Sequence, residues 1–169
     1  GDYKSPILDG DSICIDDGKI VEVGSNIEAS GIVLDAEMER LTLSFDDQIS
    51  PGPHTIVAEF TGVLNDQLHG FYRSTFTDDD GVDHTIATTQ LESTHARRAF
   101  PCFYEPAYKA SYGVTHIVPS EQFAVSNGPI ISETDLKNGR RQVVFEDTMV
   151  MSTYLVAFIV GPFEATDPV

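Results

Sequence analysis

The chain has little basic charge, few cysteines and no long apolar run. Its 169 residues hold 10 Lys and Arg against 27 Asp and Glu, which gives a formal net charge of −17. A surface of that sign repels phosphate backbones and anionic membranes, so we expect no nucleic-acid partner. No apolar segment approaches the ~18 residues that span a bilayer, and the first residues do not form a signal peptide. We interpret the acidic surface as a solubility feature, with attraction of cationic peptides or a salt-rich habitat as open alternatives.

The two cysteines, Cys14 and Cys102, form no paired spacing. A zinc knuckle, a redox motif or a disulfide framework would need one. We therefore expect two buried thiols. The low cysteine content and the lack of an export signal favour a cytoplasmic location.

Short apolar runs with a period of two dominate the chain and are bounded by Gly, Pro, Asn and Asp. This alternation is typical of strands with one buried face. Strands are predicted at residues 13–15, 19–23, 32–34, 40–45, 54–60, 70–77, 84–90, 110–118, 142–146 and 154–160. With 41% hydrophobic and 22% charged residues, the chain fits one globular domain, residues 1–169. We predict an all-β domain of mostly antiparallel strands.

Three turns and one short helix complete this prediction. Glycine follows Asp or Asn at Gly18, Gly81 and Gly139, where hairpin turns need a positive φ. Residues 93–100 are the one segment expected to form a short helix. The acidic turn at residues 78–83 partly matches a calcium-binding loop, but Phe76 stands where a further acidic residue is required. We interpret that turn as a solvated hairpin tip.

The histidines do not form a catalytic or metal-binding set by their spacing. They stand at His54, His69, His84, His95 and His116. None pairs in the His-Glu-x-x-His pattern of a zinc peptidase helix, and no Gly-x-Ser-x-Gly elbow or phosphate-binding loop occurs. We predict no catalytic residue and no metal ligand within this chain.

Residues 89–106 form the densest polar and aromatic stretch, and strand alternation stops there. It combines carboxylates, two adjacent arginines, aromatic residues and prolines. Loops of this kind on a rigid sheet are common recognition sites. An equally good reading of composition alone is a structural corner, in which Arg97 or Arg98 pairs with Glu92 or Glu105.

This stretch resembles a motif of the zinc aminopeptidases that include alanyl aminopeptidase, the puromycin-sensitive enzyme and leukotriene hydrolase. Residues 89–110 read TQLESTHARRAFPCFYEPAYKA, and the family motif reads TQFEPTDARRAFPCFDEP. Three further segments are similar to family segments in the same order: residues 70–74 (GFYRS), 126–127 (SN) and 151–158 (MSTYLVAF). The resemblance extends from about Leu41 to Phe163.

The resemblance implies a fold, a parent enzyme and a cofactor. In that family this region is a saddle-shaped β-sandwich that packs on a thermolysin-like domain, which carries Gly-x-Met-Glu-Asn and His-Glu-x-x-His motifs. Neither motif occurs here. We therefore expect the amino-terminal β-domain of a larger aminopeptidase, with the catalytic zinc domain absent. Zinc and peptide hydrolysis belong to the parent protein, and this chain alone is expected to be inactive.

The resemblance also assigns a substrate-binding residue. The family's anchor for the free α-amino group of a peptide falls on Glu92, and Gln90 is assigned to the same subsite by analogy. A carboxylate beside a partly desolvated ammonium forms a strong charge-assisted hydrogen bond. The other motif residues are expected to brace the loop: Arg97, Arg98, Phe100, Pro101 and Glu105.

Three departures from the family pattern and two alternative functions stay open. Tyr104 replaces an Asp, Gly128 replaces a Met, and Val150 replaces a Pro. None changes Glu92. The alternatives to the peptidase are a non-catalytic β-sandwich module that binds a protein partner through residues 89–106, and an inactive family member that serves as a scaffold.

Overall fold

The computed structural model describes residues 14–22, 25–49, 55–62, 64–103 and 105–166. These residues are almost entirely β-strands and loops, and every pair of neighbouring strands in the sheets is antiparallel. The all-β class is therefore confirmed. Contacts divide the chain into two compact units, Gly1–Leu64 and Asn65–Val169. The prediction of a single domain at residues 1–169 and that of a saddle shape both stay predictions.

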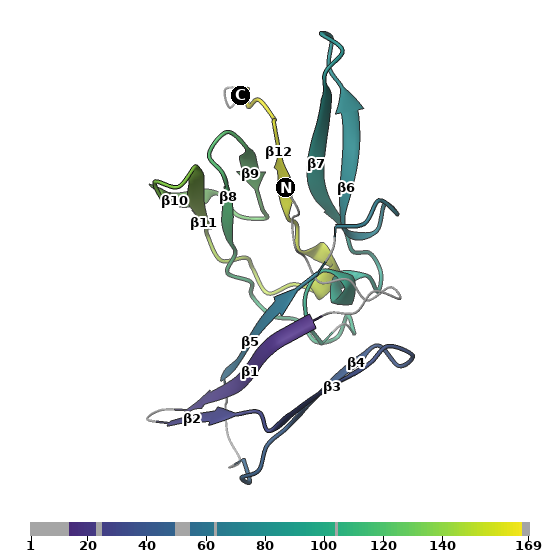
Figure 1. Ribbon diagram of the computed structural model, residues 1–169, viewed down its shortest axis with the longest axis vertical. Helices are drawn as coiled ribbons and strands as arrows, with labels where there is room; N and C mark the ends of the chain where they lie inside the picture. Colours follow the sequence, from purple (N-terminus) through teal and green to yellow (C-terminus); the bar gives the residue numbers. More distant parts are fainter. Residues whose placement is uncertain (1–13, 23–24, 50–54, 63, 104, 167–169) are drawn as a thin grey trace. The chain divides into compact units, whose positions relative to one another are not determined.

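The first unit contains a three-stranded sheet and a hairpin (Figure 1). The sheet has the order β2-β1-β5, formed by β1 (Cys14–Glu22), β2 (Ser25–Glu28) and β5 (Thr55–Thr61). The hairpin joins β3 (Gly31–Asp35) to β4 (Arg40–Ser44). Its turn is closed by Asp35, whose side chain accepts the Met38 N–H at 2.9 Å. A carboxylate that satisfies a turn N–H explains why the hairpin reverses at this point.

The hairpin predicted at Gly18 is wrong. Residues 16–18 lie inside β1, which pairs with β5 both before and after them. The register shifts between Ile15 and Asp17, which marks a β-bulge. A bulge uses the same small and acidic residues as a turn, so local sequence does not distinguish the two.

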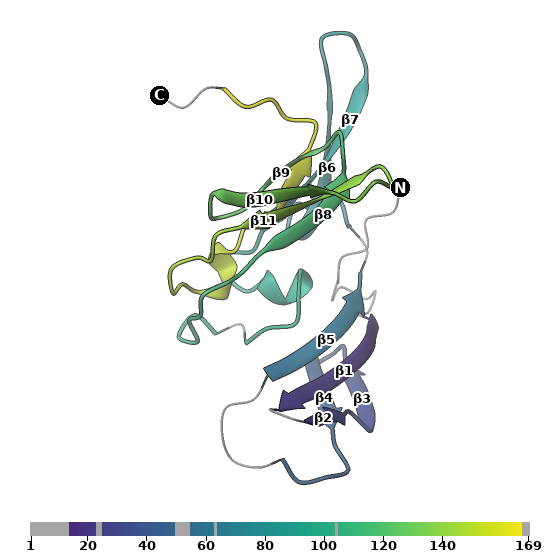
Figure 2. The ribbon, with the colours of Figure 1, turned by 90° about the vertical axis from the view of Figure 1, so that its left-hand side faces the viewer.

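The second unit has two sheets that lie one over the other (Figure 2). The four-stranded sheet, in the order β6-β7-β12-β9, is formed by β6 (Gly70–Thr77), β7 (Asp83–Gln90), β12 (Ile159–Gly161) and β9 (Phe123–Val125). The three-stranded sheet, in the order β10-β11-β8, is formed by β10 (Ile130–Asp135), β11 (Arg140–Phe145) and β8 (Thr115–Pro119). Two short 3-10 turns accompany them, η1 (Ala96–Arg98) and η2 (Thr153–Leu155).

The other two predicted hairpins are confirmed. Gly81 has a φ of 79° between β6 and β7, and Gly139 has a φ of 76° between β10 and β11. Glycine adopts these angles without the Cβ clash that other residues meet. The β6–β7 hairpin projects well beyond the rest of its sheet (Figure 1).

Aromatic rings fill the space between the two sheets of the second unit. Phe158, which precedes β12, packs edge-on against Phe71 of β6, with ring centroids 5.8 Å apart. It meets His116 of β8 at 5.5 Å, and His116 also contacts Phe145 of β11 at 5.3 Å. Perpendicular ring contacts of this kind are favourable beyond simple burial. Phe158 therefore joins the four-stranded sheet to the three-stranded one.

Several strand predictions need correction. Residues 110–118 give β8 only from Thr115, and residues 154–160 split between η2 and β12. The short strands β2, β9 and β10 were not predicted. All six residues of β10 are exposed, so it has no alternation of apolar and polar residues to detect.

Candidate functional site

The 89–106 loop begins where β7 ends, and one buried residue fixes its first turn. Leu91 is only 1% exposed and belongs to a cluster with Ala96, Ala99, Met151 and Val156. The carbonyl of Leu91 accepts the His95 N–H at 2.9 Å, which leads the backbone into η1. In place of the short helix predicted at residues 93–100, the structure has only the three-residue 3-10 turn η1.

Gly70, the glycine of the GFYRS segment, lies against the 89–106 loop. Gly70 has a φ of 74°, and a Cβ built there would lie 2.9 Å from the Cβ of Arg98. Beside this contact, the rings of His69 and His95 stack with centroids 4.7 Å apart and planes 7° from parallel. The start of β6 and the turn η1 are therefore packed directly on each other.

Hydrogen bonds join the loop's first residue to the 151–158 segment. The hydroxyl of Thr89 accepts the Phe158 N–H at 3.0 Å and donates to the Val156 carbonyl at 3.5 Å. Because one side chain satisfies two backbone groups of a distant segment, it fixes the position at which Gln90 and Glu92 leave the sheet.

The Ser-Asn pair holds the same segment from its other side. Ser126 donates its hydroxyl to the Ala157 carbonyl at 2.9 Å. The Asn127 amide donates to the Leu155 carbonyl at 2.8 Å and accepts the Ala157 N–H at 2.8 Å. The conformation of residues 155–158 is therefore set by polar side chains that the sequence prediction did not assign a role. Their position inside family motifs was the available signal.

The end of the loop is fixed in the same way. Ser152 is 4% exposed and donates its hydroxyl to the Pro106 carbonyl at 2.9 Å. Ala110 and Met151 exchange backbone hydrogen bonds of 3.1 and 2.9 Å. Within the motif, the side chains of Thr89 and Arg97 bind backbone groups of the chain itself. The pairing of Arg97 or Arg98 with Glu92 or Glu105 that the structural-corner interpretation expects stays a prediction.

Gln90 and Glu92, the two candidate substrate-binding residues, lie at the start of this loop. Both are exposed, and they flank the buried Leu91. The peptide bond between Glu92 and Ser93 is cis. Both candidate side chains are accessible to solvent.

The residues expected to brace the loop differ in their contacts and in their exposure. Arg97 donates Nε to the Thr94 carbonyl at 3.0 Å, and Phe100 packs against Tyr112 and Phe158. Glu105 is exposed, and Tyr104 lies outside the described residues. Gly128 lies so close to the Glu146 backbone that a Cβ would stand 2.4 Å from its carbonyl oxygen. The local backbone therefore has no room for the Met found in the family pattern.

Apart from the stacked pair His69 and His95, the described histidines lie in different surroundings. His116 lies among rings, and its burial lowers the pKa below the ordinary value of 6.5, with a hydrogen bond to the Val125 backbone acting in the opposite direction. His54 lies outside the described residues. Within the described ranges, no group of three His, Cys, Asp or Glu is placed to hold a metal ion.

Cys102 is half-buried beside the loop. Burial raises the pKa of its thiol to about 11, against a smaller opposing effect of Arg97. A thiol with that pKa is protonated at neutral pH and is a poor nucleophile. The expectation of a buried thiol is thus met only in part at Cys102, which is half-buried, and the Cys14 side chain lies outside what is described.

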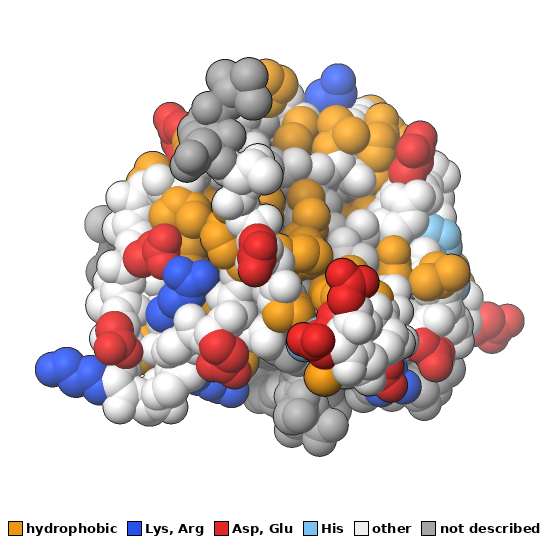
Figure 3. Space-filling view, turned by 90° about the horizontal axis from the view of Figure 1, so that it is seen from above, with side chains coloured by type: hydrophobic (Ala, Val, Ile, Leu, Met, Phe, Trp, Pro, Cys, Tyr) orange, Lys and Arg blue, Asp and Glu red, His pale blue; other side chains and the backbone are white. Residues whose placement is uncertain are grey.

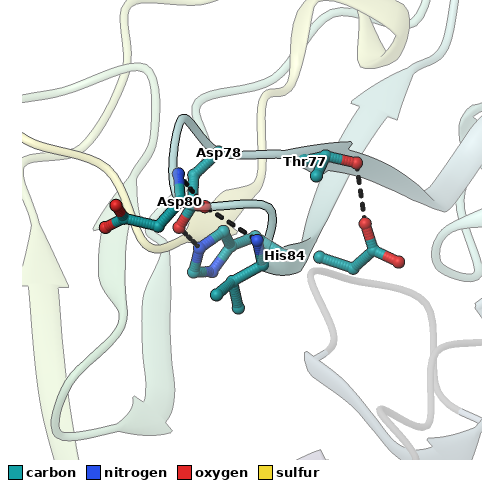
Figure 4. A network of polar contacts seen from close by, with 6 residues as sticks. Thr77, Asp78, Asp80 and His84 are labelled. Atoms are coloured by element: carbon teal, nitrogen blue, oxygen red, sulfur yellow. Dashed lines mark hydrogen bonds and ion pairs between the residues drawn. The ribbon is translucent and has the colours of Figure 1, made fainter.

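The acidic tip of the β6–β7 hairpin is organised by Asp78 (Figure 4). One carboxylate oxygen of Asp78 accepts the N–H groups of Asp80 and Val82 at 3.0 and 2.8 Å. The other lies 2.7 Å from Nε2 of His84. These contacts lower the pKa of Asp78, with the His84 bond the largest cause. The hairpin-tip interpretation is confirmed.

Acidic side chains are spread around apolar ones on the face shown in Figure 3.

Along the described part of the chain, no helix combines the length and apolar character required to cross a membrane.

The fold and the loop together define an antiparallel β-rich chain with an exposed Gln-x-Glu pair where β7 ends. The comparisons with known proteins place it further. Residues 4–155 match the model of the Peptidase M1 N-terminal domain, so the chain belongs to that family.

Individual relatives agree with this assignment. The chain is 46% identical over 129 residues to Aminopeptidase M1-A of Oryza sativa subsp. japonica, covering 76% of this chain and 14% of that protein. It is 44% identical over 131 residues to the Puromycin-sensitive aminopeptidase of Caenorhabditis elegans, covering 77% and 14%. It is 41% identical over 132 residues to the human Endoplasmic reticulum aminopeptidase 1, covering 78% and 14%. The chain thus spans about one-seventh of the length of these relatives.

Proposed function

We propose that this chain is the substrate-anchoring domain of a zinc-dependent aminopeptidase, in which Glu92 binds the free α-amino group of a peptide. The observation that carries this proposal is the exposure of Glu92 next to the buried Leu91, at the start of a loop that hydrogen bonds and packing hold to the rest of the unit. The parent protein then removes amino-terminal residues from peptides.

The proposed role follows from the chemistry of a carboxylate. A hydrogen bond between Glu92 and a substrate ammonium is charge-assisted and stronger than a neutral one. Because Thr89 and Leu91 hold the loop on the sheet, the carboxylate is presented without a large ordering cost when substrate arrives. Gln90, exposed on the same segment, is proposed to line that subsite with its amide.

Zinc is assigned to the parent and not to these residues. The described histidines and carboxylates do not converge into a ligand set, so they do not fit the metal. When bound in the remainder of the parent, zinc would supply the activated water for hydrolysis. The contribution of this chain is to position the peptide terminus, which determines the bond that is cleaved.

The test is a chimera in which this chain replaces the matched region of the Oryza sativa Aminopeptidase M1-A. We expect Glu92→Gln to lower kcat/KM for an aminoacyl p-nitroanilide by about 10- to 150-fold, as expected for loss of a hydrogen bond to a charged group. Glu105→Gln is the matched control, because it removes an exposed carboxylate from the same motif. Its kcat/KM should stay within about twofold of the unmutated chimera.

A second readout separates anchoring from a merely structural role. The ratio of kcat/KM for a free amino terminus over its acetylated analogue should collapse in Glu92→Ala. If the chimera and its Glu92→Ala variant have the same ratio and the same kcat/KM, Glu92 is not the anchor. The isolated chain assayed with zinc should show no turnover, and turnover abolished by Glu92→Ala alone would refute the need for a second domain.

The competing functions make different predictions. A binding module would capture a protein partner through the 89–106 loop while its chimera stayed inactive. An inactive scaffold would come from a gene with a degraded His-Glu-x-x-His sequence downstream. An intact motif in that reading frame would favour the peptidase.

A further inference from the structure

Two asparagines of this chain are each followed by glycine, in the pairs Asn127-Gly128 and Asn138-Gly139. Glycine has no Cβ, so its backbone nitrogen is more open to a neighbouring side chain than that of any other residue. In an Asn-Gly pair this nitrogen can attack the side-chain carbonyl carbon of asparagine, which makes asparagine chemically labile. The sequence therefore marks both asparagines for the same reaction. Gly128 stands where the family pattern has Met, so the first pair is a departure from that pattern.

The side chain of Asn127 is held at both ends. Its Nδ2 donates to the Leu155 carbonyl at 2.8 Å, and its Oδ1 accepts the Ala157 N–H at 2.8 Å. Attack by the Gly128 nitrogen requires the side chain to turn towards that nitrogen, which breaks both hydrogen bonds. The residue itself is exposed, so these bonds and not the exclusion of solvent oppose the reaction.

The space around the two glycines differs in the same direction. A Cβ built on Gly128 would lie 2.4 Å from the carbonyl oxygen of Glu146 and 3.3 Å from its backbone nitrogen. A Cβ built on Gly139 would have no other atom within 4 Å. The cyclic intermediate forms on the nitrogen of the glycine, so crowding opposes ring closure at Gly128 and open space permits it at Gly139.

Asn138 lies in the turn between β10 and β11, and every residue from 130 to 140 is exposed. The backbone on both sides of it is held, because Leu136 donates its N–H to the Arg140 carbonyl and Ser120 donates its N–H to the Gly139 carbonyl, each at 3.0 Å. Among the described residues, the Asn138 side chain has no hydrogen-bond partner. The turn thus leaves this amide available for reaction.

We propose that Asn138 is a modification site at which the folded chain deamidates, and that the fold protects Asn127. The Gly139 nitrogen gives its proton to water or hydroxide and forms a bond to Cγ of Asn138. The bond between Cγ and Nδ2 then breaks, and the amide nitrogen leaves as ammonia with a proton from solvent. Water opens the resulting cyclic imide at either carbonyl and gives aspartate or isoaspartate, with no oxidation or reduction.

Both products change the turn between β10 and β11. Each adds a negative charge to an already acidic chain. Isoaspartate also places an extra methylene group in the backbone between the two residues that bond to Ser120 and precede β11. No residue of the 89–106 loop takes part, so the reaction is independent of the role proposed for Glu92.

The test is prolonged incubation of the chain in mildly alkaline buffer, followed by peptide mass spectrometry with fragmentation that distinguishes isoaspartate from aspartate. We expect Asn127 to react about 10- to 100-fold more slowly than Asn138, because two net-favourable hydrogen bonds must break first. In guanidinium chloride, where neither contact exists, the two rates should approach each other.

Three results would overturn the proposal. The first is an Asn127 rate in the folded chain that equals or exceeds the Asn138 rate. The second is a difference that persists unchanged in guanidinium chloride, which would assign it to the neighbouring residues in sequence. The third is an Asn138 that reacts only in the denatured chain.

Substitutions link each rate to its cause. Asn138→Gln should abolish isoaspartate in the turn, because a glutamine side chain must close a larger and slower ring. Ser126→Ala removes the hydroxyl that bonds to the Ala157 carbonyl at 2.9 Å and should speed the reaction of Asn127. Ser132→Ala on β10 is the matched control and should leave that rate unchanged. Equal Asn127 rates in the two serine variants would contradict the assignment of its protection to the held 155–157 segment.

Discussion

The hydroxyl of Thr89 accepts the backbone N–H of Phe158 at 3.0 Å, which joins the end of β7 to the segment that enters β12. The two residues are far apart in sequence and belong to two separate motifs. Their bond shows why both motifs occur together: one supplies the exposed strand end, and the other supplies the backbone that holds it.

Thr89→Val should destabilise the chain because Val keeps the shape but leaves the Phe158 N–H without an acceptor. An unsatisfied backbone donor costs about 1 to 3 kcal/mol. Urea unfolding monitored by circular dichroism measures the difference. Thr89→Ser, which keeps the hydroxyl, should retain most of the stability. Equal unfolding midpoints for Thr89→Val and the unmutated chain would show that the bond contributes nothing.

Gly128→Ala should destabilise the chain by about 2 to 4 kcal/mol, in the upper range for single substitutions. The added Cβ would stand 2.4 Å from the Glu146 carbonyl oxygen, and backbone atoms cannot move aside as a flexible side chain can. Gly31→Ala is the control, because its Cβ would meet Ser44 at an ordinary 3.6 Å. Thermal unfolding of the two variants should therefore differ clearly. Similar losses in both would contradict the steric argument.

His116 should make the unfolding free energy depend on pH below about 6.5. Its pKa is lowered in the folded chain by burial among aromatic rings, so the unfolded chain binds the proton more tightly. The stabilising contribution is therefore full above the unfolded pKa, and it is lost as pH falls towards the folded pKa. Urea unfolding from pH 7.5 to 5 should show a steeper loss for the unmutated chain than for His116→Phe. Parallel profiles would exclude His116 as the cause.

Asp78 should titrate below its ordinary pKa of 3.8, mainly because its carboxylate bonds to His84. A carboxyl group with a lowered folded pKa stabilises the fold above its unfolded pKa, and this effect disappears as pH falls through the folded value. Carbon-13 NMR titration of the Asp78 carboxyl group measures the pKa directly. His84→Ala should move it upward, and an unchanged value would assign the shift to the backbone bonds from Val82 and Asp80.

The prediction of strands succeeded where one face is buried. The first half of β7 alternates between exposed residues and the half-buried His84 and Ile86, and the glycine turns at Gly81 and Gly139 have the positive φ that the sequence indicated. The prediction of strands failed where apolar and polar residues do not alternate. All residues of β10 are exposed, and the apolar run at residues 154–160 divides between a 3-10 turn and a strand. Short apolar runs do not reveal which of these structures they form.

For the candidate site, too, some features follow from the sequence and others only from the tertiary structure. The sequence by itself determined the all-β class, the two confirmed glycine turns of the second unit and the family motif that singles out Glu92, because alternation, turn chemistry and a long motif are local properties. Only the tertiary structure decided which motif residues are exposed and which hold the fold. That Thr89, Asn127 and Ser152 bind backbone while Gln90 and Glu92 face solvent depends on segments brought together from distant positions in the sequence. Local pattern carries no information about such contacts, because a buried polar group is satisfied by whatever partner the folded chain places beside it.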